Sequence, residues 1–240
     1  SESPSSEHST DIIEELRHSI PTFFNTDLRT YTVVFQFDKE QAIRTISEAL
    51  PKEFAHEVLY SSSSNKALLD SQKCFNKTTP IKILDSDSDL DYEDDYRRAY
   101  LFQLVDEFNG DVMSKEDLCK ISTNPKLFTI ADASQYITVR HLNLTETPLD
   151  AVVIDLEVSI GYPSISLLLF KSDYFLSLTK PYFGGGTLVY ALTNSSFEKF
   201  RMKPAERFED GTLPFLTIAS IDIAVDFSKS MNITEMISRK

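Results

Sequence analysis

A chain of 240 residues suits one α/β domain, or one large domain with a small appendage, and its 41% hydrophobic residues are enough for a core. The formal net charge of −13 argues against a nucleic-acid or anionic-membrane surface, and no apolar run approaches the roughly 18 residues of a membrane span. Two cysteines are too few for a disulfide framework, so we expect a reduced, cytoplasmic setting.

Strands alternate with helices along most of the chain. Residues 1–10 are polar, carry no signal-peptide pattern and are predicted to form a disordered tail. Predicted strands cover Tyr31–Phe37, Val58–Tyr60, Tyr100–Val105, Leu127–Ile130, Ala151–Leu156, Ser166–Phe170 and Leu188–Leu192. Predicted helices cover Thr10–Ile20, Lys39–Leu50, Ser61–Leu69, Ser114–Ile121, Lys171–Leu178 and Phe215–Phe227. This alternation predicts a parallel or mixed sheet covered on both faces.

An acidic insertion, about residues 76–98, interrupts this pattern. Seven of the eleven residues from Asp85 to Asp95 are acidic. A calcium loop of the EF-hand type would need Gly and Glu where the chain has Leu90 and Tyr96, so that motif fails. We expect a solvated insertion; the alternative is an interaction segment for a protein partner, switched by phosphorylation at Ser86 or Ser88.

Two glycine motifs, Tyr182–Thr187 and Arg207–Thr212, give the strongest signal. Three consecutive glycines indicate positive φ angles or a close backbone approach. In this order the motifs resemble the pyridoxal-phosphate (PLP) enzymes of aminotransferase class V, and in particular the sulfurase domain of molybdenum cofactor sulfurases, which is similar to cysteine desulfurases. The resemblance covers residues 11–230 and leaves 231–240 as a tail. It implies a three-layer α/β/α large domain of fold type I, a truncated or rudimentary small domain, and a homodimer.

The resemblance also assigns cofactor positions. Asp132 matches the acid that faces the pyridine nitrogen and keeps the ring protonated. Gln135 matches the residue that contacts the ring hydroxyl, and Thr187 and Thr212 match positions near the phosphate. From local sequence alone, Asp132 also reads as a capping residue at a strand-to-helix turn, and tight turns also explain the glycines. We therefore expect these four positions to be vestigial.

Three other family positions have changed. The phosphate-binding turn is replaced by Phe37–Glu40, which places two carboxylates and only Lys39 where a dianion should bind. The ring-stacking histidine is replaced by Ser63. Counting back from Gly161, Val158 stands where the family has its Schiff-base lysine; a slip of one residue gives Glu157 or Ser159, and neither forms an imine.

These departures predict a non-catalytic pseudoenzyme with a scaffold or interaction role, no catalytic residue and no metal site. We expect no bound cofactor, and PLP only if the alignment at Val158 is wrong. The alternative is an active PLP-dependent cysteine desulfurase or molybdenum cofactor sulfurtransferase, with a lysine reaching in from elsewhere. A third hypothesis is a protein that binds a small anion at the glycine turns.

Overall fold

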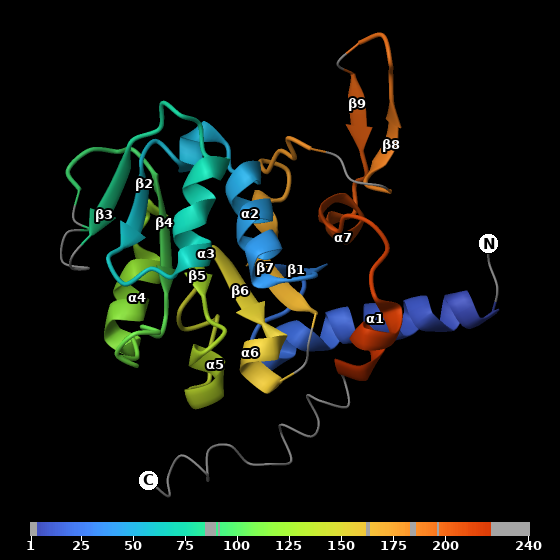
Figure 1. Ribbon diagram of the computed structural model, residues 1–240, viewed down its shortest axis with the longest axis horizontal. Coiled ribbons are helices and arrows are strands. Elements are labelled where there is room, and N and C mark those ends of the chain that lie inside the picture. The colour runs from blue at the N-terminus through green and yellow to red at the C-terminus, as the bar shows by residue number, and fades with distance from the viewer. Residues whose placement is uncertain are drawn as a thin grey trace, which may run out of the picture.

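The computed structural model describes residues 4–84, 90, 92–161, 164–182, 186–195 and 197–221, with side chains from residue 8 onward. Its centre is a seven-stranded sheet in the order β1-β7-β6-β5-β4-β2-β3 (Figure 1). The strands are β1 Tyr31–Gln36, β2 Val58–Ser61, β3 Ile81–Leu84, β4 Arg98–Gln103, β5 Leu127–Asp132, β6 Ala151–Asp155 and β7 Ser166–Lys171. Only β7 runs antiparallel to its neighbours β1 and β6, so the sheet is mixed, as predicted.

Helices cover both faces of the sheet and produce two apolar cores. One core contains side chains of α1 (Pro4–Phe23), α4 (Lys115–Thr123), α5 (Tyr136–Val139) and α6 (Leu156–Ile160). The other contains side chains of α2 (Lys39–Ala49), α3 (Lys66–Asp70) and α7 (Pro204–Phe208). Apart from the edge strand β3, the strands are buried on both sides, because alternate residues of each strand point into opposite cores. This is the three-layer α/β/α large domain that the sequence predicts.

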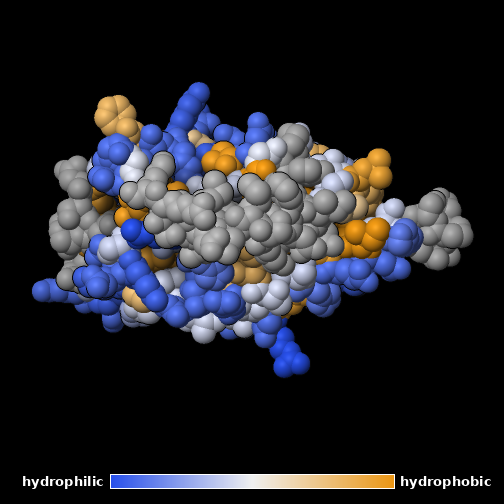
Figure 2. All heavy atoms as spheres, turned by 90° about the horizontal axis from the view of Figure 1, so that it is seen from below, coloured by the Kyte–Doolittle hydropathy of each residue, from blue (hydrophilic) through white to orange (hydrophobic). Residues whose placement is uncertain are grey.

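After β7, the described chain forms a 3₁₀ turn, a two-stranded hairpin and two short helical segments. Strands β8 (Leu188–Ala191) and β9 (Glu198–Phe200) form a separate two-stranded hairpin that projects from the body (Figure 1). Helix α7 and a helical segment at 215–221 follow. Seen from below, hydrophilic side chains dominate, with apolar ones in scattered places (Figure 2).

The structure corrects several predicted elements. Helix α1 begins at Pro4, so residues 4–10 are helical rather than disordered. Helix α3 begins only at Lys66, because Asn65 caps it and the serines before it form a turn closed by a Ser64 N–H to Ser61 carbonyl hydrogen bond. The helix predicted from Lys171 is only the 3₁₀ turn Ser172–Tyr174. Strands β3 and β9 and helices α5, α6 and α7 were not predicted, and residues 222–227 of the last predicted helix lie outside the described residues.

Gly161 ends helix α6 in the left-handed region, with φ of +71°, and its N–H donates to the Glu157 carbonyl at 3.0 Å. A Cβ there would meet nothing within 4 Å, so only backbone strain opposes a side chain. We expect Gly161→Ala to lower the free energy of unfolding by about 1 kcal/mol, measured by urea denaturation. Gly161→Asn should recover most of this loss, because Asn tolerates the left-handed region; an alanine variant as stable as the native chain would contradict the argument.

Candidate functional site

A buried carboxylate lies where the central parallel strands end. The strands β2, β4 and β5 are parallel, so their carboxyl ends meet at one edge of the sheet, where α/β proteins commonly bind ligands. Asp132 is the last residue of β5 and is 5% exposed. Its Oδ1 accepts hydrogen bonds from the Ser134 backbone N–H (3.0 Å) and hydroxyl (2.6 Å). Its Oδ2 accepts one from the Asn65 amide (2.9 Å) and lies 3.4 Å from the Lys39 ammonium.

Two other elements bring Asn65 and Lys39 to Asp132. Asn65 caps α3 through its own Oδ1, and its amide also donates to Glu107 at 3.2 Å. Lys39 is the first residue of α2, with a side chain only 14% exposed, and its ammonium lies 3.5 Å from Glu107. Burial acts to lower the pKa of Lys39, but the attraction of Asp132 and Glu107 outweighs it, so the pKa is raised. The amine nearest to Asp132 in this network is therefore a protonated one.

A cavity of about 420 Å³ opens beside this network. It shares Asn65 and Glu107 with the network and is otherwise lined by Ser62, Ser63, Ser64, Gln103, Asp106 and Phe108. The lining has two carboxylates and no lysine or arginine. Such a surface favours a ligand group that is cationic or donates hydrogen bonds over an anionic one.

The amino-terminal end of α2, where the family resemblance placed a phosphate, is capped by the chain itself. Asp38 accepts the Gln41 N–H at 2.6 Å, and the Gln41 side chain accepts the Phe37 N–H at 3.1 Å. We expected Lys39 to offset one of the two carboxylates beside it; instead its ammonium pairs with Asp132. This helix end presents carboxylates, which do not fit a phosphate dianion.

The other predicted positions are distributed over the fold. Gln135 immediately precedes α5 and is half-buried. Val158 lies on α6, and 43% of its surface is exposed. Asp155 caps α6 through the Glu157 N–H at 2.9 Å, and burial raises the pKa of its carboxyl. The acidic segment 85–95 falls partly outside the described residues; within it, Asp94 pairs with Arg98.

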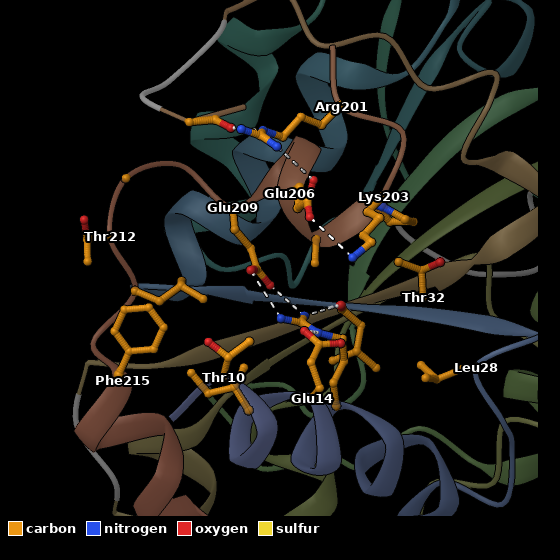
Figure 3. Close-up of a pocket in the computed structure, with 18 residues that line it drawn as sticks. Thr10, Glu14, Leu28, Thr32, Arg201, Lys203, Glu206, Glu209, Thr212 and Phe215 are labelled. Carbon is orange, nitrogen blue, oxygen red and sulfur yellow. Dashed lines mark hydrogen bonds and ion pairs between the residues drawn. The ribbon is translucent and has the colours of Figure 1, made fainter. Parts of the chain in front are cut away.

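Thr187 and Thr212 belong to a different part of the molecule. A second cavity, of about 750 Å³, lies between α1, the edge strand β1 and the later part of the chain, where Gly186 and Thr212 line it (Figure 3). Residues 183–185 of the first glycine motif lie outside the described residues. Thr187 is fully buried next to Gly186. No residue lines both cavities, and β1 is three strands away from β5, or roughly 14 Å at ordinary strand spacing. The structure therefore separates these threonines from Asp132 and Gln135.

Several charged pairs line this second cavity. Arg17 of α1 bonds to Glu209 at 2.7 Å, and Glu206 lies between Arg201 (3.4 Å) and Lys203 (3.5 Å), as Figure 3 shows. The sequence indicated a solvated basic stretch at Lys199, Arg201, Lys203 and Arg207. Arg201 and Lys203 are exposed, as that prediction requires, and they also line the cavity, where each has an acidic partner.

Other kinds of site find little support in the described part of the chain. Among those residues, no group of three or more His, Cys, Asp or Glu is arranged to hold a metal. Burial, with Glu48 nearby, raises the pKa of the Cys74 thiol to about 11, which disfavours a reactive thiolate. None of the helices searched is long and apolar enough to cross a bilayer.

Comparison with known proteins agrees with the fold. The family model for aminotransferase class-V matches residues 2–240. The chain belongs to the aminotransferase class-V family. It is 30% identical to a molybdenum cofactor sulfurase of Neurospora crassa over 94% of this chain and 26% of that protein. It is 25% identical to the human molybdenum cofactor sulfurase over 94% of this chain and 28% of that protein. The chain thus spans about a quarter of the length of these relatives.

Solved structures share the fold. A cysteine desulfurase of Thermococcus onnurineus NA1 superimposes with a TM-score of 0.78 and 17% identity, over 95% of this chain and 59% of that one. A C-DES variant, solved with glycine covalently linked to its PLP cofactor, superimposes with a TM-score of 0.76 and 14% identity, over 99% of this chain and 66% of that one. At this level of identity, the likeness concerns the fold.

These findings correct the prediction about the cofactor. The expectation of no bound cofactor is wrong, because the family and its structural neighbours point to PLP. The residues around Asp132 and at the start of α2 fit PLP only in part. Asp132, buried and hydrogen-bonded, fits a protonated pyridine nitrogen. Asp38 and Glu40 at the start of α2 do not fit its phosphate, and Val158 offers no amine.

Proposed function

We propose that this domain is a non-catalytic member of the aminotransferase class-V family that serves as a scaffold or interaction module. The observation that carries the proposal is that the amine of Lys39, beside Asp132, is protonated. Lys39 reaches Asp132, but Asp132 and Glu107 hold it as an ammonium, which has no lone pair for attack on a carbonyl. Val158, at the position that the alignment assigns to the family lysine, supports the same conclusion. The relatives are molybdenum cofactor sulfurases, so we place the scaffold role in that context.

A specific observation favours one alternative, an active PLP-dependent cysteine desulfurase or sulfurtransferase. Its amine would be Lys39, which lies 3.4 Å from the carboxylate that fits the pyridine nitrogen. The raised pKa of Lys39 argues against this reading, because a nucleophilic amine must lose its proton.

The position of the glycine motifs bears on oligomeric state. Thr187 and Thr212 lie beyond β1, away from Asp132 of the same chain. We infer that any contact they make with a cofactor is at the site of a second copy, so homodimerisation is part of this proposal. Sedimentation of the purified chain tests it separately.

Absorbance spectroscopy with borohydride tests the loss of imine chemistry. The purified chain is mixed with PLP, its spectrum is recorded before and after borohydride, and PLP-labelled peptides are sought by mass spectrometry. We expect no PLP fixed to Lys39, because Asp132 and Glu107 hold this amine as an ammonium. The T. onnurineus cysteine desulfurase, treated in parallel, is the positive control. A reduced adduct on Lys39 would instead establish the alternative.

A further inference from the structure

The acceptor sites of the Asp132 carboxylate are already filled. A carboxylate offers about four lone-pair sites, and Asp132 has four partners within the protein. A ligand group can therefore reach this carboxylate only by replacing one of the four.

Three of these partners are held in place by other bonds. The Ser134 N–H belongs to the backbone immediately after β5. The Ser134 hydroxyl also accepts the Asp155 N–H at 2.9 Å, which ties it to the end of β6. The Asn65 side chain caps α3 by accepting the Leu68 N–H at 3.1 Å, so moving it would also uncap the helix.

Lys39 is different. Its ammonium is carried on a flexible four-carbon stem, and its 3.4 Å contact is the longest of the four. Its second partner, Glu107, is 43% exposed in its side chain and lines the 420 Å³ cavity, so the ammonium can leave Asp132 while it remains beside a carboxylate. We propose that Lys39 is a displaceable internal counter-ion of Asp132, which a ligand carrying a protonated ring nitrogen or an ammonium group must move aside.

The displaced state requires a cationic ligand. Without Lys39, Asp132 would be a buried carboxylate that lacks a cation, and such a group is costly unless another positive charge replaces the first. A protonated pyridine ring supplies that charge. The inference rests on the proposed function only because both place the ligand site at Asp132. The need to displace Lys39 weakens the apparent affinity for the ligand, because the ligand binds only the fraction of molecules in which Lys39 has left Asp132.

The affinity of the chain for PLP, measured by equilibrium dialysis at neutral pH, tests this inference. We expect Lys39→Met to bind PLP about tenfold more tightly than the native chain, since the competing cation is gone. General electrostatics predicts the reverse, because removing a lysine weakens the binding of an anionic phosphate. Lys66→Met is the matched control: Lys66 is the first residue of α3, is exposed, and should leave the affinity unchanged.

Two further variants keep the test decisive. Lys39→Gln removes the charge but keeps a hydrogen-bond donor, and serves if the methionine variant does not fold. Adding Asp132→Asn to Lys39→Met should abolish the gain, because the competition is for that carboxylate. An unchanged, weaker or undetectable affinity in both Lys39 variants overturns the inference, as does a gain that persists without Asp132. A borohydride adduct on Lys39 of the native chain overturns the proposed function instead, so the two failures are distinguishable.

Discussion

Glu209→Ala should lower the free energy of unfolding by about 3 kcal/mol, because it leaves the buried Arg17 with only the mostly exposed Glu14, at 3.4 Å, as an acidic partner. Glu209 and Arg17 have side chains only 9% and 8% exposed, and they join at 2.7 Å. Glu209 also accepts the Phe35 N–H at 2.9 Å, and Arg17 donates to the Val33 carbonyl at 2.8 Å. The pair therefore forms hydrogen bonds with two backbone groups of the edge strand β1, and it anchors the segment that carries the second glycine motif. Urea denaturation measures the loss.

Two comparisons separate this mechanism from a general charge effect. Glu206 lies three residues before Glu209 and has an exposed side chain. Glu206→Ala should change the free energy of unfolding by no more than about 0.5 kcal/mol. Replacing both partners, as Arg17→Met with Glu209→Leu, should cost less than Glu209→Ala alone, because no buried charge is left unpaired. If Glu209→Ala is no less stable than Glu206→Ala, the Arg17–Glu209 pair does not anchor this segment.

Asp150→Ala should also lower the free energy of unfolding by about 3 kcal/mol, by an effect at the opposite end of the sheet. Asp150 is 3% exposed and precedes β6. One oxygen accepts from Lys171 and Tyr174, each at 2.8 Å; the other accepts from the Thr129 backbone and hydroxyl. Removing the carboxylate leaves these donors unsatisfied where β5, β6 and β7 meet.

The matched control for Asp150 is Asp173→Ala, on an exposed residue of the neighbouring 3₁₀ turn, which should be nearly neutral. Thermal unfolding of both variants is the measurement. Equal melting temperatures for the two would show that the Asp150 network contributes nothing specific to stability.

Local patterns predicted most of the elements around the site. The helix from Lys39 and the strand Tyr31–Phe37 match α2 and β1 to within one residue, because apolar spacing and β-branched runs are local signals. Strand β3 was missed: Ile81, Lys82 and Ile83 are all exposed, so no alternation between buried and exposed positions marks this edge strand. The distant partners of Asp132 were missed as well, since Asn65 and Lys39 are far from it in the chain.

The sequence by itself determined the family, the three-layer architecture, the position of Asp132 at a strand end and the absence of a lysine at 158. These follow from short-range periodicity and from motifs read in chain order. Only the tertiary structure decided what the carboxylate of Asp132 contacts and where the glycine motifs lie. Strand order brings Lys39 and Asn65 to Asp132 and carries Thr187 and Thr212 beyond β1. Ion pairs between residues tens of positions apart form only when strand order closes that distance, and no local pattern encodes strand order.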